Sequence, residues 1–193
     1  MIAESILFVL IFSMIKKYNF SNTEFFPKKY ITFPLVFVVI NIGLFVAAKT
    51  GASPVQIRIL HMLSFVFFYP YMIKNYKYTG MLFLIAGVSL NLIVMYLNGF
   101  RMPIDPYFYS KIASSNDYAL TRAGFNLYHS LIDENTVLYL LGDTIPLMKP
   151  YPFPKVVSIG DILIGIGFSA LAITALRGDY NEKNEEGEIS DEK

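Results

Sequence analysis

The stretch that decides the fold is MLFLIAGVSLNLIVMYL, residues 81–97, followed at once by NGFRMPIDP, residues 98–106. The first part contains no charged residue, and the second contains a glycine, an arginine and two prolines. A helix needs about 20 mostly apolar residues to cross a hydrocarbon core of about 30 Å. The stretch therefore predicts a membrane helix over 81–97, with Arg101 just beyond it at the level of the lipid headgroups.

The composition of the whole chain agrees with a membrane protein. Hydrophobic residues make up 54% of the sequence and charged residues 16%, whereas a soluble domain carries about 25% charged residues. Mean hydropathy is positive, at +0.47. The net charge of +1 gives no basic surface for a nucleic acid, and the lack of cysteine excludes disulfides, thiolate metal sites and cysteine nucleophiles.

Four further apolar segments accompany 81–97, at 2–15, 31–48, 57–73 and 159–176. They predict an all-α fold, a polytopic membrane helix bundle of about five spans. The first segment is short, about 21 Å of helix, so a partial or re-entrant helix stays an alternative there. Glu4 stands where a secretory signal would carry a basic residue, which favours a retained first helix.

Lysines in the short loops predict the orientation. Positively charged residues concentrate in cytoplasmic loops, and here they lie after the first span and between the third and fourth spans, at Lys16, Lys17, Lys28, Lys29, Lys74 and Lys77. If all five segments cross, both loops fall on the same side. We therefore expect a multi-pass protein of the plasma membrane with its N-terminus outside and its C-terminus in the cytoplasm.

The long connection 98–157 then lies outside the cytoplasm. It is rich in aromatic and aliphatic residues, with a broken helical periodicity over 127–141 and prolines at both ends. We expect two or three short helices that form an extracytoplasmic cap on the membrane bundle of residues 1–176. The acid-rich segment 177–193 predicts a disordered cytoplasmic tail.

Polar residues inside the predicted spans have two interpretations. Gly87, Asn91 and Asn98 share one face of the fourth helix, which favours packing and hydrogen bonding between helices over a ligand-lining role. His61 is expected to be a hydrogen-bonded helix residue rather than a ligand. With His61 and His129 as the two histidines, and one of them outside the spans, bis-histidine haem ligation is not expected, and we predict no cofactor and no metal site.

A second group of polar residues gathers at the outer ends of the spans. Ser158 and Asp161 have the spacing of a capping box, in which each side chain bonds the backbone amide of the other. Asp143 follows Gly142 in a predicted tight turn. Arg101 is expected to pair with Asp143 or Asp161 as a static brace, since separating a shielded ion pair is costly.

The alternative to a brace is a ligand site. An arginine, two carboxylates and a histidine near the headgroups suit a phosphate or a carboxylated small molecule. Such a site would use Asn98, Arg101, His129, Asp143 and Asp161, with Asn91 and Ser158 in structural roles. No motif of a hydrolase, a zinc peptidase or a P-loop enzyme occurs, so we predict no catalytic residue.

Three blocks of this sequence, NGFRMPID, LLGDTIP and SIGDILIGIG, resemble the signature blocks of an uncharacterised bacterial integral membrane protein family, a domain of unknown function. The resemblance covers the chain from about the second span to the fifth. It implies a small polytopic plasma-membrane protein of bacteria and carries no activity with it.

The sequence is compatible with three functions. The favoured one is a non-enzymatic membrane subunit or binding protein, whose partners are the lipid bilayer and a protein partner or a second copy of the chain. The second is a transporter of small solutes or lipids, which requires Gly87, Asn91 and Asn98 to line a cavity. The third is an enzyme acting on lipid headgroups through the outer polar group.

Overall fold

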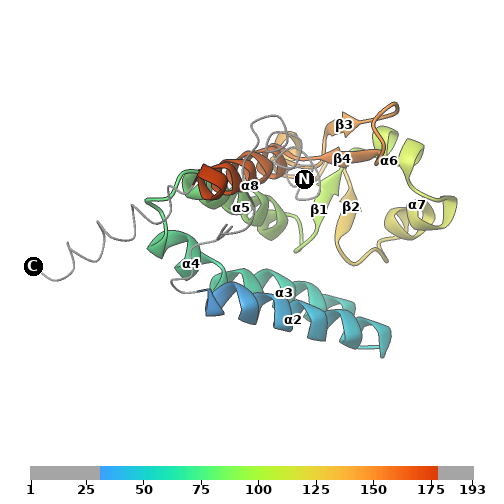
Figure 1. Cartoon of the computed structure of the whole chain (residues 1–193). Helices are drawn as coiled ribbons and strands as arrows, with labels where there is room; N and C mark the ends of the chain where they lie inside the picture. Colours follow the sequence, from blue (N-terminus) through green and yellow to red (C-terminus); the bar gives the residue numbers. More distant parts are fainter. Residues whose placement is uncertain (1–30, 178–193) are drawn as a thin grey trace, which may run out of the picture.

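The computed structural model describes residues 31–177 of the chain (Figure 1). The predicted first span at 2–15, and the predicted tail beyond Arg177, lie outside the described residues. The described part is mostly helical, as expected, but it also contains four short strands, so the all-α prediction is only partly correct.

Three apolar helices have nearly the predicted bounds. They are α2 (Thr32–Lys49), α5 (Met81–Leu97) and α8 (Ile159–Arg177). In the described part of the chain, α2 and α8 are long and apolar enough to cross a membrane, and α5 is slightly shorter. The structure thus supplies two candidate spans, whereas the sequence predicted four in this part of the chain.

The predicted span at 57–73 is wrong as a single helix. It divides into α3 (Pro54–Ser64), the 3₁₀ turn η1 (Phe65–Phe67) and α4 (Tyr69–Lys74). Pro70 explains the division, because a proline has no N–H to continue the helical hydrogen bonds and is tolerated only in the first turn of a helix. It stands in the first turn of α4.

Among the helices of residues 31–177, α5 and α8 have the most extensive contact, and they run in opposite directions. Gly87 of α5 faces Gly160 of α8 so closely that a Cβ on Gly87 would lie 2.5 Å from the Gly160 carbonyl oxygen. Gly80 and Gly167, each seven residues from the first pair, approach each other in the same way. Two glycine pairs at the same spacing therefore bring the two backbones together, as small residues do in membrane helix pairs.

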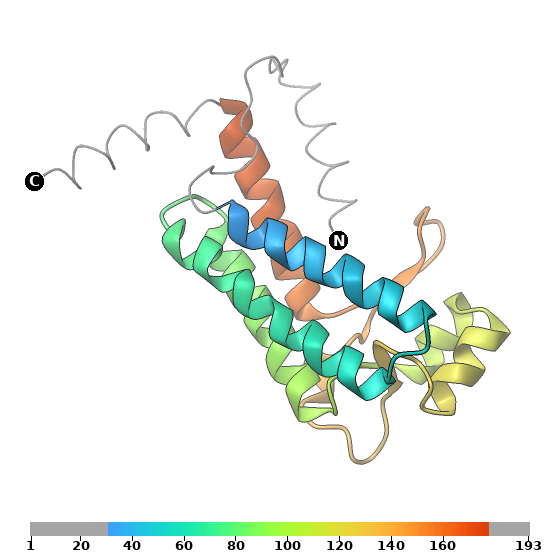
Figure 2. The ribbon, with the colours of Figure 1, turned by 90° about the horizontal axis from the view of Figure 1, so that it is seen from below.

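Helix α4 packs against α5, and α2 and α3 form a second layer next to the α5–α8 pair (Figure 1). Figure 2 shows α2 and α3 lying side by side, with α4 leading from α3 back to α5. The apolar core lies where α4, α5 and α8 meet, with the fully buried side chains Met72, Met81, Leu84 and Leu171.

The connection 98–157 forms a cap at one end of the helices and contains short helices, as predicted, but it also contains strands that were not predicted (Figure 1). Its helices are α6 (Pro106–Ile112), α7 (Ser115–Arg122) and the 3₁₀ turn η2 (Tyr139–Leu141). Strand β1 (Met102–Ile104) pairs in parallel with β2 (His129–Leu131), and β3 (Ile145–Leu147) pairs with β4 (Lys155–Val157) in the antiparallel sense.

The helical periodicity expected over 127–141 is wrong for a physical reason. Residues 129–131 take their backbone partners from β1, which lies more than twenty residues earlier in the chain. Such a partner can override a weak local preference for helix. The end of α5 does follow its sequence, since Gly99 adopts a left-handed backbone with φ of +67° and turns the chain toward β1.

Candidate functional site

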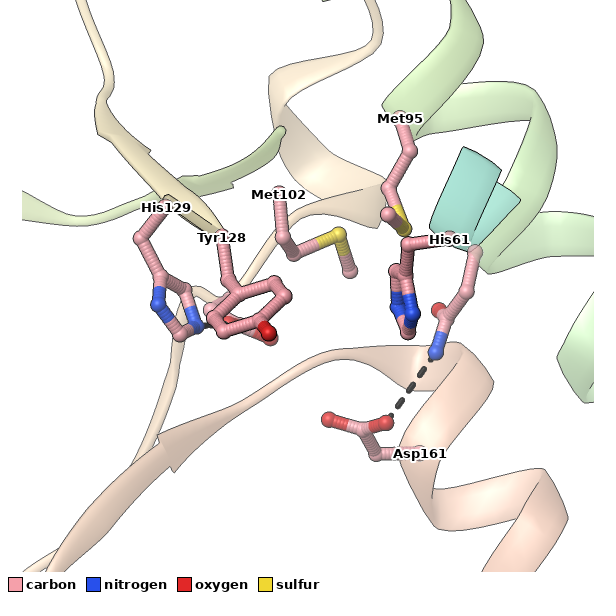
Figure 3. Close-up of a pocket in the computed structure, with 8 residues that line it drawn as sticks. His61, Met95, Met102, Tyr128, His129 and Asp161 are labelled. Carbon is pink, nitrogen blue, oxygen red and sulfur yellow. Dashed lines mark hydrogen bonds and ion pairs between the residues drawn. The ribbon is translucent and has the colours of Figure 1, made fainter. Parts of the chain in front are cut away.

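A pocket of about 380 Å³ lies where the helices meet the cap (Figure 3). The side chains of the cap approach it from one side and those of the helices from the other. Its lining residues are His61, Asn91, Met95, Met102, Tyr128, His129, Asp143 and Asp161. Segments far apart in the sequence thus converge on one cavity of a size typical of small-molecule sites.

The pairing of β1 with β2 positions the residues on the cap side of this pocket. Met102 and His129 are register partners in β1 and β2, and the Met102 N–H donates to the Tyr128 carbonyl at 2.8 Å. The side-chain oxygen of Asn126 accepts from the backbone N–H groups of both Tyr128 and His129, at 2.9 Å each. The backbone that carries both rings is therefore fixed before any ligand enters.

Asp143 is held on the other edge of β1. Its N–H donates to the Pro103 carbonyl at 2.8 Å, and its own carbonyl accepts from the Asp105 N–H at 2.9 Å. Gly142 allows this approach, because a Cβ there would lie 2.6 Å from the Pro103 oxygen. With β1 between them, Asp143 Oδ2 and His129 Nε2 lie 3.4 Å apart.

The Asp143 carboxylate is buried and only partly satisfied. The residue is 5% exposed, and its Oδ1 has no hydrogen-bond partner among residues 31–177. Burial raises the pKa of Asp143 above its ordinary value, the hydrogen bond from His129 opposes this, and the nearby Asp161 charge raises it further. Burying a hydrogen-bond acceptor without a donor destabilises the folded state, so Asp143 is a candidate ligand contact.

The helix side of the pocket is built around the capping box, which the structure confirms. The Asp161 N–H donates to Ser158 Oγ at 2.9 Å, and the Ser158 N–H donates to Asp161 Oδ2 at 3.3 Å. Asn91 of α5 extends the box, since its Nδ2 donates to Asp161 Oδ1 at 3.0 Å and its Oδ1 accepts from Ser158 Oγ at 2.9 Å. This network joins α5 to the start of α8 and orients Asp161.

His61 enters the pocket from α3. Its Nδ1 lies 2.5 Å from Asn41 Oδ1 in α2, which confirms that it is a hydrogen-bonded helix residue. It also lines the pocket and packs its ring edge-to-face against Tyr128, with ring centroids 5.4 Å apart. The sequence interpretation of His61 was therefore correct about its hydrogen bond but did not predict that it also lines the pocket.

Arg101 does not form the predicted brace. Its Nη1 donates to the Gly124 carbonyl at 3.1 Å, and within the described part of the chain it pairs with neither Asp143 nor Asp161. Burial and the nearby Arg58 lower the pKa of Arg101. The predicted ion pair is thus wrong, because β1 carries the chain away and His129 takes the place beside Asp143.

Asn98 also lies outside the pocket. Its side chain donates to the carbonyls of Val94 and Val137 and accepts from the Val137 N–H at 2.9 Å. It ties the end of α5 to the cap and has no lining role. Of the five predicted ligand residues, the pocket brings together His129, Asp143 and Asp161.

Four lining residues were not predicted from the sequence, namely His61, Met95, Met102 and Tyr128. Tyr128 had one usable signal, its position directly before His129. Met102 stands in the block NGFRMPID that carries the family resemblance, but the resemblance gave it no role. Met95 had no signal, because a methionine in an apolar helix is ordinary packing material. Within residues 31–177, no three acidic or histidine side chains are placed to hold a metal ion.

Comparison with known proteins assigns this chain to a family. The chain belongs to the family of unknown function DUF5317, whose model matches residues 24–173 and so includes the pocket and the cap. An uncharacterized protein of Thermotoga maritima is 32% identical over 111 residues, which is 57% of this chain and 60% of that protein. No solved structure matches.

Proposed function

We propose that this protein is a non-enzymatic membrane protein that binds a small molecule in the pocket between its helices and its cap. The observation that carries the proposal is Asp143, whose carboxylate is held in the pocket wall with one oxygen unpartnered by the described residues. Folded proteins retain unsatisfied buried groups where function uses them. A ligand with a hydrogen-bond donor would satisfy this oxygen.

Membrane insertion is supported by the surface of α2. Its apolar side chains point outward over most of the helix, as shown by Leu35, Val39, Ile42 and Phe45, which are 57–68% exposed. Water would penalise a contiguous apolar surface of this extent, whereas lipid or a membrane partner would cover it. The lysine distribution favours the orientation with the cap and its pocket on the outer side of the plasma membrane.

Ligand binding is better supported than transport or catalysis. The transporter hypothesis needs Gly87, Asn91 and Asn98 around one cavity, but Gly87 packs on Gly160 and Asn98 bonds to Val137. The headgroup-enzyme hypothesis needs Arg101 beside the carboxylates, and its guanidinium instead bonds to Gly124. Neither observation weakens a binding site around Asp143.

The proposal is tested by a thermal-shift screen of the full-length protein in detergent, using a mixed set of small amines, carboxylic acids, phosphate esters and polyols. Met95→Trp fills the pocket from α5, and Ile93→Trp is its matched control because Ile93 is 48% exposed on the same helix. We expect compounds that raise the melting temperature of the wild type and of Ile93→Trp but not of Met95→Trp. A screen without any compound that behaves in this way contradicts the proposal.

A further inference from the structure

We infer that the ligand of this pocket is a small organic cation that carries N–H donors, such as an alkylammonium or a guanidinium compound. The inference rests on the proposed function and names its ligand class. It differs from the ligand site that the sequence analysis gave as the alternative to a brace, which suited a phosphate or a carboxylated small molecule because it contained Arg101.

The ionisable side chains that line the pocket favour a cationic ligand. Two carboxylates, Asp143 and Asp161, line the pocket, and neither lysine nor arginine is among the residues that the structure places around it. With both lining histidines neutral, at least one carboxylate charge remains, whether or not Asp143 is protonated. A proton on His129 balances the charge of one carboxylate. The pocket is therefore negative when His61 and His129 are neutral, and it carries no net positive charge while His61 is neutral, which disfavours an anion.

The hydrogen bonds of Asn41 determine which nitrogen of His61 carries the proton. Ser64 Oγ donates to the His61 carbonyl at 2.6 Å, so it must accept from Asn41 Nδ2 at 3.0 Å. Asn41 Nδ2 also donates to the Phe37 carbonyl at 2.8 Å. This orientation of the amide makes Asn41 Oδ1 the acceptor from His61 Nδ1–H.

In the neutral ring, Nε2 of His61 is then a hydrogen-bond acceptor. His61 lines the same pocket as Asp143 and Asp161, whose carboxylate oxygens are also acceptors. Asp143 Oδ1 has no partner among the described residues. Two of the donor groups nearby are already committed, since Asn91 Nδ2 donates to Asp161 and His129 Nε2 faces Asp143 Oδ2. The Tyr128 hydroxyl can either donate or accept. A ligand that supplies several N–H donors and a positive charge matches this arrangement.

The remaining walls favour an organic ligand over a metal ion. Met95, Met102 and the ring of Tyr128 add apolar surface next to the acceptors (Figure 3). An alkyl group can rest on these side chains while its charged end reaches the carboxylates, and an aromatic face attracts a cation. In the described range, no cluster of acidic and histidine side chains has the geometry of a metal site.

The test uses the full-length protein in detergent and three probes of similar size: n-butylammonium, tetramethylammonium and butyrate, with agmatine as a guanidinium probe. Calorimetry measures affinity, and ¹⁵N-histidine NMR reports contact, since the sequence contains two histidines. We expect n-butylammonium or agmatine to bind at least tenfold more tightly than butyrate and to shift the Nε2 signal of His61. Tetramethylammonium lacks N–H donors and is expected to bind at least tenfold more weakly than the tighter of these two.

Asp143→Asn should weaken the binding of the amine at least tenfold, whereas Glu134→Gln should not change it. Glu134 is an exposed acid of the same cap, away from the pocket, so it controls for the loss of one negative charge. The comparison of probes on the wild type stands even if Asp143→Asn does not fold.

Different results would overturn different claims. Binding of butyrate as tight as that of the amines, or failure of both n-butylammonium and agmatine to bind, overturns the cationic class. Equal binding of tetramethylammonium overturns the role of the N–H donors. In each of these cases the proposed binding function still stands if the wider screen finds a ligand that Met95→Trp excludes, and it fails if that screen finds none.

Discussion

The imidazole of His129 and the carboxylate of Asp143 lie 3.4 Å apart. Their backbone segments pair with opposite edges of the same strand, β1, so the two side chains meet across it. The pair uses Oδ2 of Asp143 and leaves Oδ1 buried without a partner from the described chain. A single histidine thus offsets part of the cost of burying this carboxylate. The rest of that cost weighs against folding unless a ligand offsets it.

We therefore expect Asp143→Asn to stabilise the ligand-free protein at neutral pH, by roughly 1 kcal/mol or about 2–4 °C in melting temperature. Burial raises the pKa of Asp143, so the folded wild type holds this proton more tightly than the unfolded chain does. The stability linked to the protonated carboxyl is therefore present at acidic pH and is lost as the pH rises through the raised pKa. Melting curves of both proteins from pH 4 to pH 8 measure the effect.

The pH dependence distinguishes this cause from ordinary repacking. The advantage of Asp143→Asn should be largest at neutral pH and should shrink as the pH falls toward the ordinary carboxyl value of 3.8. Glu134→Gln, in an exposed turn, should show no such trend. An advantage that instead grows toward acidic pH would mean that the buried charge is not what destabilises the protein.

The local parts of this site could be predicted from the sequence. Ser158 and Asp161 lie three residues apart, and a capping box needs no information from elsewhere in the chain. The bounds of α5 and α8 followed from long uninterrupted apolar runs. Asp143 and Asp161 were grouped correctly by their predicted depth at the outer side of the membrane, and His129 joined them as the histidine of the predicted cap.

The failures depended on distant partners. The pairing of β1 with β2 decides where Arg101 and His129 go, and strands of three residues give too little pattern to detect. Arg101 was placed by its depth relative to the membrane alone, which says nothing about the direction of the chain after Gly99. The polar contact between Asn41 and His61 joins two helices, so neither sequence segment indicates it.

Ser158 should contribute more to stability than a typical helix cap. It is fully buried, and its hydroxyl both accepts from the Asp161 N–H and donates to Asn91 Oδ1. Ser158→Ala removes a cap and leaves a buried amide oxygen without its donor, so we expect a loss of roughly 2–3 kcal/mol. Thermal or chemical unfolding in detergent measures this loss.

Ser114→Ala is the matched control for Ser158→Ala. Ser114 is the N-cap of α7 and accepts from the Asp117 N–H at 3.1 Å, but it is exposed, and its hydroxyl donates within α7, to Asp117 Oδ2 at 2.6 Å. We expect its removal to cost about 1 kcal/mol. Equal losses for the two variants would show that the bond to Asn91 adds nothing.

Gly87 is expected to tolerate no side chain. A Cβ there would lie 2.5 Å from the Gly160 oxygen and 2.8 Å from Ile164 Cγ1, so Gly87→Ala must separate α5 from α8. We expect a loss of about 1–3 kcal/mol, as for other overpacked cores. Gly43→Ala in α2 is the control, because nothing lies within 4 Å of its Cβ position, and it should be neutral or stabilising by about 0.5–1 kcal/mol. If both variants melt alike, the close approach of α5 and α8 is not tight enough to matter.

The proposed orientation in the membrane can be tested directly, because the chain contains no cysteine. Ser115 is exposed at the start of α7 in the cap, and Lys77 is exposed in the turn between α4 and α5. In intact cells, a membrane-impermeant maleimide should label Ser115→Cys, and it should label Lys77→Cys only after the membrane is opened. The positive-inside rule supplies the reason, since Lys74 ends α4 and Lys77 lies in the short turn that follows it. The reverse pattern would invert the orientation and place the pocket on the cytoplasmic side, and labelling of both in intact cells would show that α5 does not separate the two compartments.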